Sequence, residues 1–148
     1  MKIVKASLIA AIALVGSSAF AQTPINASFA VSTEVLKFCK ISANPIAIAP
    51  ITAGLDEGAK SNSGAVNVYC TNQTNYNLAV TESLNLKHEG TETFIATSLV
   101  LDNTSGKGAG FSADRMQSHK VTATIAETAY QNALAGKYNA TTTVTLTY

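Results

Sequence analysis

The chain has 148 residues, of which 47% are hydrophobic and 13% charged, with ten Lys and Arg against nine Asp and Glu. A formal net charge of +1 offers no basic surface for a polyanion, so the composition excludes a nucleic-acid-binding protein. The length predicts a single domain that is large enough to bury a core.

The first 21 residues have the pattern of a secretory signal peptide. Lys2 and Lys5 precede a short apolar run, SLIAAIALVG, and Ala19-Phe20-Ala21 is a small-x-small cleavage site. The run is too short to span a bilayer and no later run approaches that length, so we expect export without direct membrane insertion. Cleavage leaves a mature chain that starts at Gln22, with eight basic against nine acidic residues and a net charge of −1.

An alternating segment opens the mature chain. In TPINASFAVSTEV, which starts at Thr23, apolar side chains recur at every second position, the period of a half-buried strand. Polar Ser32 and Thr33 separate this segment from a second apolar cluster. We therefore predict an N-terminal extension over residues 22–33 and a domain over residues 34–148, whose own first strand covers about residues 34–41. The apolar positions of the extension are Ile25, Ala27, Phe29 and Val31.

The chain has two cysteines, Cys39 and Cys70, and both lie in the exported part. An even number of cysteines in an oxidising compartment favours a disulfide. The alternative is a redox or metal pair, but the spacing is not CxxC and no histidine lies nearby to complete a ligand set. We predict a structural disulfide, which destabilises the unfolded chain by about 3 to 4 kcal/mol on the loop-entropy model.

The rest of the chain predicts short strands separated by turns. PIAIAPITA (45–53) is apolar but contains two prolines, which suits an edge strand or one broken between two sheets. LDEGAKSNSG (55–64) and NTSGKGAGFSAD (103–114) predict loops, and AETAYQNALA (126–135) a loop or one or two helical turns. About seven strands rich in Val and Thr indicate an all-β fold, an antiparallel immunoglobulin-like sandwich. The remaining predicted strands are AVNVYC (65–70), NYNLAV (75–80), a short one in LNLKHEGTE (84–92), TFIATSLVLD (93–102), HKVTATIAE (119–127) and GKYNATTTVTLTY (136–148).

The last predicted strand ends at the last residue of the sequence. Gly136-Lys137-Tyr138 is typical of the turn that leads into strand F of such a sandwich, and the strand then runs to Tyr148. No sequence follows that could form the pairing strand G. We therefore expect an incomplete sandwich, with a groove of unpaired backbone and apolar side chains that a strand from elsewhere fills.

These features together resemble the pilin subunits of chaperone/usher pili. The resemblance rests on the alternating N-terminal extension, the cysteine that follows it, a second cysteine that closes the next core strand, and the terminal GKYNATTTVTLTY. AYQNALAGKYNATTTVTLTY looks most like the archaic, Csu-type branch that shares the spore coat protein U domain. The similarity covers both ends of the chain, while residues 56–120 share only the regular succession of predicted strands and turns.

The resemblance implies donor-strand complementation. A periplasmic chaperone first lends a strand to the groove, and at an outer-membrane usher the extension of the next subunit replaces it. It implies a homo-polymeric surface pilus that is exported through the periplasm and supports adhesion and biofilm formation. In this reading, the donor side chains are Ile25, Ala27, Phe29 and Val31, the groove is lined by Val144, Leu146 and Tyr148, and the structural turn contains Gly136 and Tyr138.

Two simpler interpretations stay open. INASFAV could be the first strand of this domain itself, paired at the edge of its own sandwich. The protein could also be a monomeric secreted β-sandwich binding module of the lectin type, but such modules carry aromatic side chains in loops. Here the five tyrosines lie mostly within or beside predicted strands, and the chain has no tryptophan.

The sequence does not predict an enzyme, a cofactor or a metal site. His88 and His119 lie in polar stretches and are expected to be exposed. Asp56 and Glu57 are adjacent in a turn, so their carboxylates point apart. The glycines of residues 106–110 have no following Lys-Ser pair and helix start, as a phosphate-binding loop requires.

Overall fold

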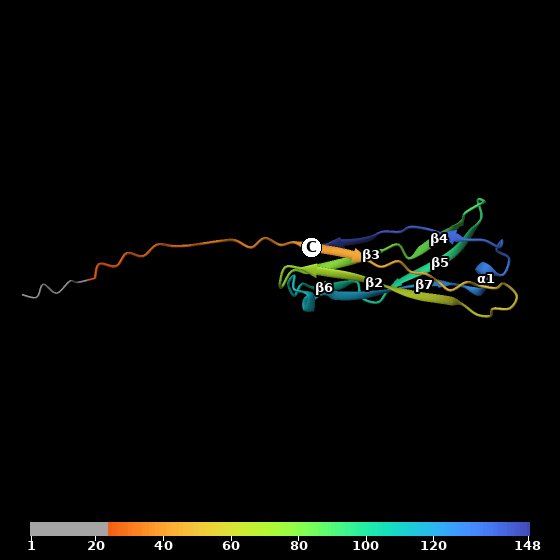
Figure 1. The fold of residues 1–148 in the computed structure, drawn as a ribbon, viewed down its shortest axis with the longest axis horizontal. Coiled ribbons are helices and arrows are strands. Elements are labelled where there is room, and N and C mark those ends of the chain that lie inside the picture. The colour runs from red at the N-terminus through yellow and green to blue at the C-terminus, as the bar shows by residue number, and fades with distance from the viewer. Residues whose placement is uncertain (1–23) are drawn as a thin grey trace, which may run out of the picture. The chain divides into compact units, whose positions relative to one another are not determined.

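The computed structural model describes residues 24–148, so the predicted signal peptide lies outside the described residues. The chain divides into two units, Met1–Thr33 and Glu34–Tyr148. In the described part of the first unit, residues 24–33, no residue belongs to a helix or strand, and Ile25, Phe29 and Val31 are 97%, 87% and 84% exposed. Every helix and strand of the described residues lies in the second unit (Figure 1).

The second unit is an antiparallel β-sandwich. One sheet has six strands in the order β1-β2-β7-β5-β4-β8, the other has three in the order β6-β3-β9, and each pairing is antiparallel. A 3₁₀ turn, η1 (Ala113–Arg115), and one helical turn, α1 (Glu127–Tyr130), lie in the connections. The strands are β1 (Cys39–Ala43), β2 (Lys60–Cys70), β3 (Asn75–Val80), β4 (Ser83–His88), β5 (Phe94–Leu101), β6 (Ser105–Lys107), β7 (Gln117–Ile125), β8 (Tyr138–Asn139) and β9 (Val144–Thr147).

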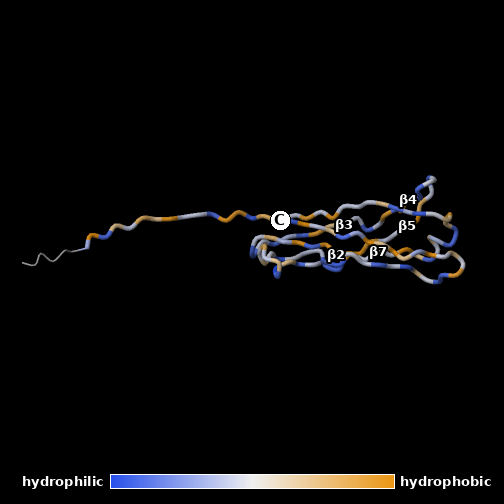
Figure 2. Tube along the Cα trace, in the orientation of Figure 1, coloured by the Kyte–Doolittle hydropathy of each residue, from blue (hydrophilic) through white to orange (hydrophobic). Residues whose placement is uncertain are grey.

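The core lies between the two sheets and is built from alternate positions of the strands. Tyr76 and Leu78 of β3 pack against buried side chains of β2, β5 and β7, such as Val68, Leu99 and Val121. Apolar and polar residues are interleaved along the strands in Figure 2, because successive side chains of a strand point to opposite faces. The predicted all-β sandwich is confirmed, as is the single helical turn within residues 126–135.

The last predicted strand is wrong as a continuous element. Tyr138 and Asn139 form β8 at the edge of the six-stranded sheet, whereas Val144–Thr147 forms β9 at the edge of the other sheet. Residues 140–143 cross between the sheets. Three consecutive threonines, Thr141 to Thr143, interrupt the alternation of threonine and apolar residues within this crossing, a signal that the prediction of one continuous strand passed over.

Other boundaries also differ from the predictions. The first strand starts at Cys39 instead of residue 34, and β2 extends back to Lys60, into the predicted turn. The glycine-rich loop contains the short strand β6, and residues 45–53 form no strand, in keeping with their two prolines. Among residues 24–148, no helix is long and apolar enough to cross a membrane.

Candidate acceptor groove

A cleft with a volume of about 1160 Å³ opens into the core of the second unit. Residues 43–53 form one wall and residues 133–142 the other. The floor consists of side chains from β2, β4, β5 and β7, among them Val66, Leu99 and Ala123. The cleft is therefore an elongated apolar groove between two segments that lie outside the strands for most of their length.

Each wall contains a stretch of unpaired backbone. Within the described part of the chain, no amide of residues 45–51 donates a hydrogen bond, and no backbone group of residues 140–143 takes part in one. An unpaired edge is a template for an additional strand. Here two such edges face one apolar floor, so an extended peptide in the groove can bond to both walls while it buries its side chains.

The wall of residues 43–53 is held against β2 at three points. The Asn44 amide donates to the Ala65 carbonyl at 2.9 Å, and the Asn62 side chain donates to the Ala47 carbonyl at 2.6 Å. At Gly64, an added Cβ would lie 2.7 Å from Cγ1 of Ile46 and 2.9 Å from the Asn44 carbonyl oxygen. Glycine is therefore required at this position for the wall to approach so closely.

The far end of this wall is tied to α1. The Tyr130 hydroxyl donates to the Gly58 carbonyl at 2.7 Å, and the Gly58 amide donates to the Glu127 carboxylate at 2.9 Å. Burial of the ring raises the pKa of the Tyr130 hydroxyl. Hydrogen bonds from the Thr52 amide and then from the Lys60 ammonium hold the pKa of Asp56 below its ordinary value of 3.8. These bonds fix the loop of residues 52–60, which follows the groove wall of residues 43–53.

The predicted groove residues have three different environments. Val144 lines the groove, Leu146 is half-buried and packs on the core, and Tyr148 is 56% exposed. Neither Leu146 nor Tyr148 is among the lining residues, and their assignment to the groove stays a prediction. Sequence reasoning missed the opposite wall, although Ile46 and Ile48 alternate between two prolines, the pattern of a half-buried segment that lacks ladder bonds.

The predicted turn lies at the rim of the groove. Gly136 has a φ of +152°, and a Cβ there would lie 2.2 Å from Nε2 of His88. The Tyr138 ring lines the groove, meets the His88 ring edge to face at 5.0 Å, and donates its hydroxyl proton to the Leu134 carbonyl at 2.9 Å. His88 is half-buried by these contacts, not exposed as predicted.

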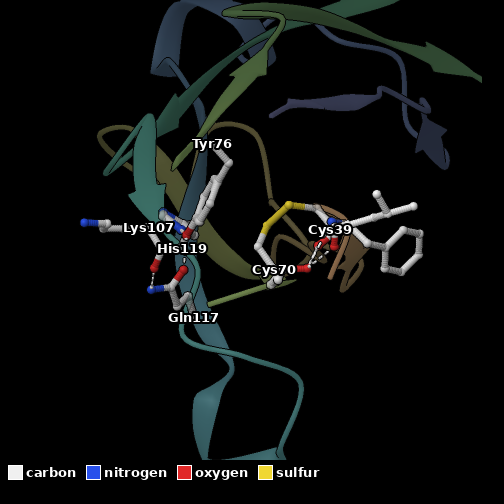
Figure 3. Close-up of a disulfide and its surroundings, with 9 residues drawn as sticks. Cys39, Cys70, Tyr76, Lys107, Gln117 and His119 are labelled. Atoms are coloured by element: carbon white, nitrogen blue, oxygen red, sulfur yellow. Dashed lines mark hydrogen bonds between the residues drawn. A yellow bond between two sulfur atoms is a disulfide. The ribbon is translucent and has the colours of Figure 1, made fainter. Parts of the chain in front are cut away.

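The predicted disulfide is confirmed. Cys39 and Cys70 are bonded, with their Cα atoms 4.1 Å apart, and they form the first pair of the β1–β2 ladder (Figure 3). Next to the bridge, the Phe38 amide donates to Oγ1 of Thr71 at 3.0 Å and the Thr71 amide donates to the Phe38 carbonyl at 2.9 Å. The junction between the predicted extension and β1 is therefore fixed to the end of β2.

His119 is buried, and the prediction of an exposed side chain is wrong. Its Nε2 lies 2.7 Å from the Tyr76 hydroxyl and its Nδ1 lies 3.0 Å from the Asn103 carbonyl, while the Tyr76 hydroxyl donates to Gln117 at 2.6 Å (Figure 3). Burial raises the pKa of Tyr76. These bonds hold the loop before β6 against β3 and β7. The alternation of β7 points His119 inward, which its polar neighbours in sequence conceal.

Residues 25–96 match the family model of the Spore Coat Protein U domain. No curated protein matches the sequence. A solved chain in the crystal structure of the CsuC–CsuE chaperone–tip adhesion subunit pre-assembly complex, from archaic chaperone-usher Csu pili of Acinetobacter baumannii, is similar with a TM-score of 0.53 and 18% identity. The match covers 77% of this chain and 40% of that chain. The family match supports the resemblance to proteins with the spore coat protein U domain, and the structural match shows a shared fold.

Proposed function

We propose that this chain, which is similar to Csu-type spore coat protein U pilins, is a structural subunit of a chaperone/usher pilus. It polymerises when the extension of one copy, residues 22–33, enters the groove of the next copy. A periplasmic chaperone occupies the groove first, and an outer-membrane usher hosts the exchange. The resulting fibre is carried on the cell surface, where it supports adhesion and biofilm formation.

The observation that carries this proposal is the groove with unpaired backbone on both walls. A complete sandwich leaves no such opening into its core, since its edge strands are paired, short or covered. The groove of about 1160 Å³ has a mainly apolar floor of side chains from β2, β4, β5 and β7, which suits the alternate side chains of a strand. Main-chain hydrogen bonds to the walls supply affinity and the apolar side chains supply specificity.

The extension has the complementary features. Ile25, Phe29 and Val31 are almost fully exposed in residues 24–33, so their burial elsewhere is favourable. At about 1.5 to 3 kcal/mol for each large side chain, these three contribute about 5 to 9 kcal/mol before the backbone bonds and the cost of ordering are counted. An assembly of this kind dissociates very slowly.

Electrophoresis of the exported protein without boiling tests the proposal. We expect a ladder of multimers that collapses to monomer on boiling, because strand insertion resists detergent but not heat. A variant that lacks residues 23–32 keeps the complete second unit and is expected to give no ladder. A monomer from the full chain under both conditions would contradict the proposal and favour a self-contained binding module.

A further inference from the structure

The surface at the start of the second unit is apolar and aromatic. The rings of Phe38 and Phe111 stack with centroids 5.8 Å apart and planes at 29°, yet these side chains remain 57% and 48% exposed. Leu36 and Met116 are also large apolar side chains exposed at this end. We refer to Leu36, Phe38, Phe111 and Met116 as the root patch.

The root patch has a fixed position. Oγ1 of Thr71 accepts a hydrogen bond from the Phe38 amide at 3.0 Å and donates toward the Leu36 carbonyl at 3.3 Å. The disulfide follows at the next residue, Cys39. Exposed aromatic side chains that are held in place are the usual anchors of protein interfaces, since little conformational entropy is lost when they are covered.

The opposite end of the second unit has matching chemistry. Figure 1 places α1 at the end of the sandwich away from β6 and the C-terminus. Leu55, in the loop tied to α1, is 82% exposed, and Leu134, at the end of the groove, is 50% exposed. The α1 end therefore exposes apolar side chains next to the groove. The root patch likewise exposes apolar side chains, close in sequence to the extension.

The charges of the two ends are also complementary. At the α1 end, Asp56 pairs with Lys60 at 3.1 Å and Glu92 with Lys87 at 2.7 Å. The other carboxylates there, Glu57, Glu89 and Glu127, outnumber Lys137, so the net charge is negative. At the root end, Arg115 pairs with Asp114 at 3.2 Å, and the remaining lysines outnumber Glu34. Opposite net charges at the two ends steer a head-to-tail encounter between copies and disfavour contact between like ends. The lysines at the root end are Lys37, Lys40 and Lys107.

We propose that the root patch docks on the α1 end of a second copy of this chain, against Leu55 and Leu134. This inference rests on the proposed function. Val31 and Leu36 are five residues apart and therefore at most about 17 Å apart along an extended chain, so insertion of Val31 brings the patch to the end of the neighbouring groove. A strand that adds to β9 in the antiparallel sense of its sheet runs against the 133–148 segment and leaves the groove at the α1 end. A head-to-tail contact between different surfaces propagates as an open fibre.

Chemical cross-linking of assembled full-length protein tests this contact. In a variant with Phe111→Cys and Leu134→Cys, a short bismaleimide should join neighbouring copies, so that multimers survive boiling. The control is Val100→Cys with Leu134→Cys, because Val100 is 62% exposed on β5 and away from the root patch. Cross-linked multimers well above the control support the proposal. Yields equal to the control, in protein that still forms the unboiled ladder, overturn the docking contact and leave the proposed function intact.

A second measurement avoids added cysteines. Phe111→Asp should lower the multimer fraction on unboiled gels at least tenfold while the amount of full-length protein stays unchanged, whereas Val100→Asp should leave the ladder as it is. An equal ladder in both variants overturns the docking contact. If the wild-type chain forms no ladder at all, the proposed function fails and the docking contact fails with it.

Discussion

Replacement of Phe29 by aspartate distinguishes two roles for the extension of residues 22–33. It is either a strand donated to another copy or the first strand of the domain's own sandwich. Phe29 is 87% exposed, so the change removes little packing from the protein itself. We expect the exported subunit to keep its fold and its disulfide. Assembly should fail, because in the proposed fibre the same side chain enters an apolar groove of the neighbouring copy.

The size of the effect follows from the chemistry of the groove. Loss of a buried phenylalanine forfeits about 2 to 3 kcal/mol, and placing an unpaired carboxylate in an apolar site costs several kcal/mol more. A total of about 5 kcal/mol corresponds to a more than thousandfold weaker insertion. Among the described residues that line the groove, Lys137 is charged, while the floor residues of β2, β4, β5 and β7 are apolar apart from Thr97.

The assay compares unboiled gels with immunoblots of full-length periplasmic protein. The matched control is Ser28→Asp, which adds the same charge one residue away, on the opposite face of the alternating segment. We expect the ladder to vanish for Phe29→Asp and to remain for Ser28→Asp. A normal ladder from Phe29→Asp, or loss of the subunit itself together with the ladder, would refute the assignment of this segment as a donor strand.

Three further changes test the domain. Cys39→Ser should lower the free energy of unfolding by about 3 to 4 kcal/mol in denaturant titrations, and reduction of the wild type should reproduce the loss; equal stability would contradict a structural role for the bridge. Gly64→Val should displace Ile46 and cost about 1 to 3 kcal/mol, together with a smaller multimer fraction, whereas an unchanged melting temperature would mean that the wall moves freely. Because the folded pKa of Asp56 is lowered, its stabilising effect is complete above pH about 3.8 and is lost as the pH falls through the folded pKa, so Asp56→Asn should flatten acid unfolding below that pH. An identical acid profile would show that the bonds to Asp56 contribute nothing.

The elements that were predicted well are those whose alternation is locally complete. NYNLAV coincides with β3, and TFIATSLVLD differs from β5 by one residue at each end. In both cases buried and exposed positions alternate without interruption, and turn residues flank the strand. Period-two patterns of this kind identify strands because one face is buried and the other is not.

The groove was less accessible to sequence reasoning, because its parts are separated along the chain. The split of the last strand depends on which sheet edge is free at each point, and this is a tertiary property. The wall of residues 43–53 reads as a poor strand because of its prolines, and its packing depends on Gly64, which lies in a predicted turn. His119 was expected to be exposed because its neighbours in sequence are polar, while its partner Tyr76 is 43 residues away.

The disulfide at the junction of the extension has a mechanical consequence. In a fibre of the proposed kind, tension on the extension of one copy enters the second unit at Phe38 and reaches Cys39 one residue later. The bridge passes this load covalently to Cys70, at the end of the longest strand, β2, which is paired with β7 along nine positions. The bridge therefore prevents the force from breaking the hydrogen bonds of the β1–β2 ladder one after another. The force instead acts along β2, as shear on its pairing with β7.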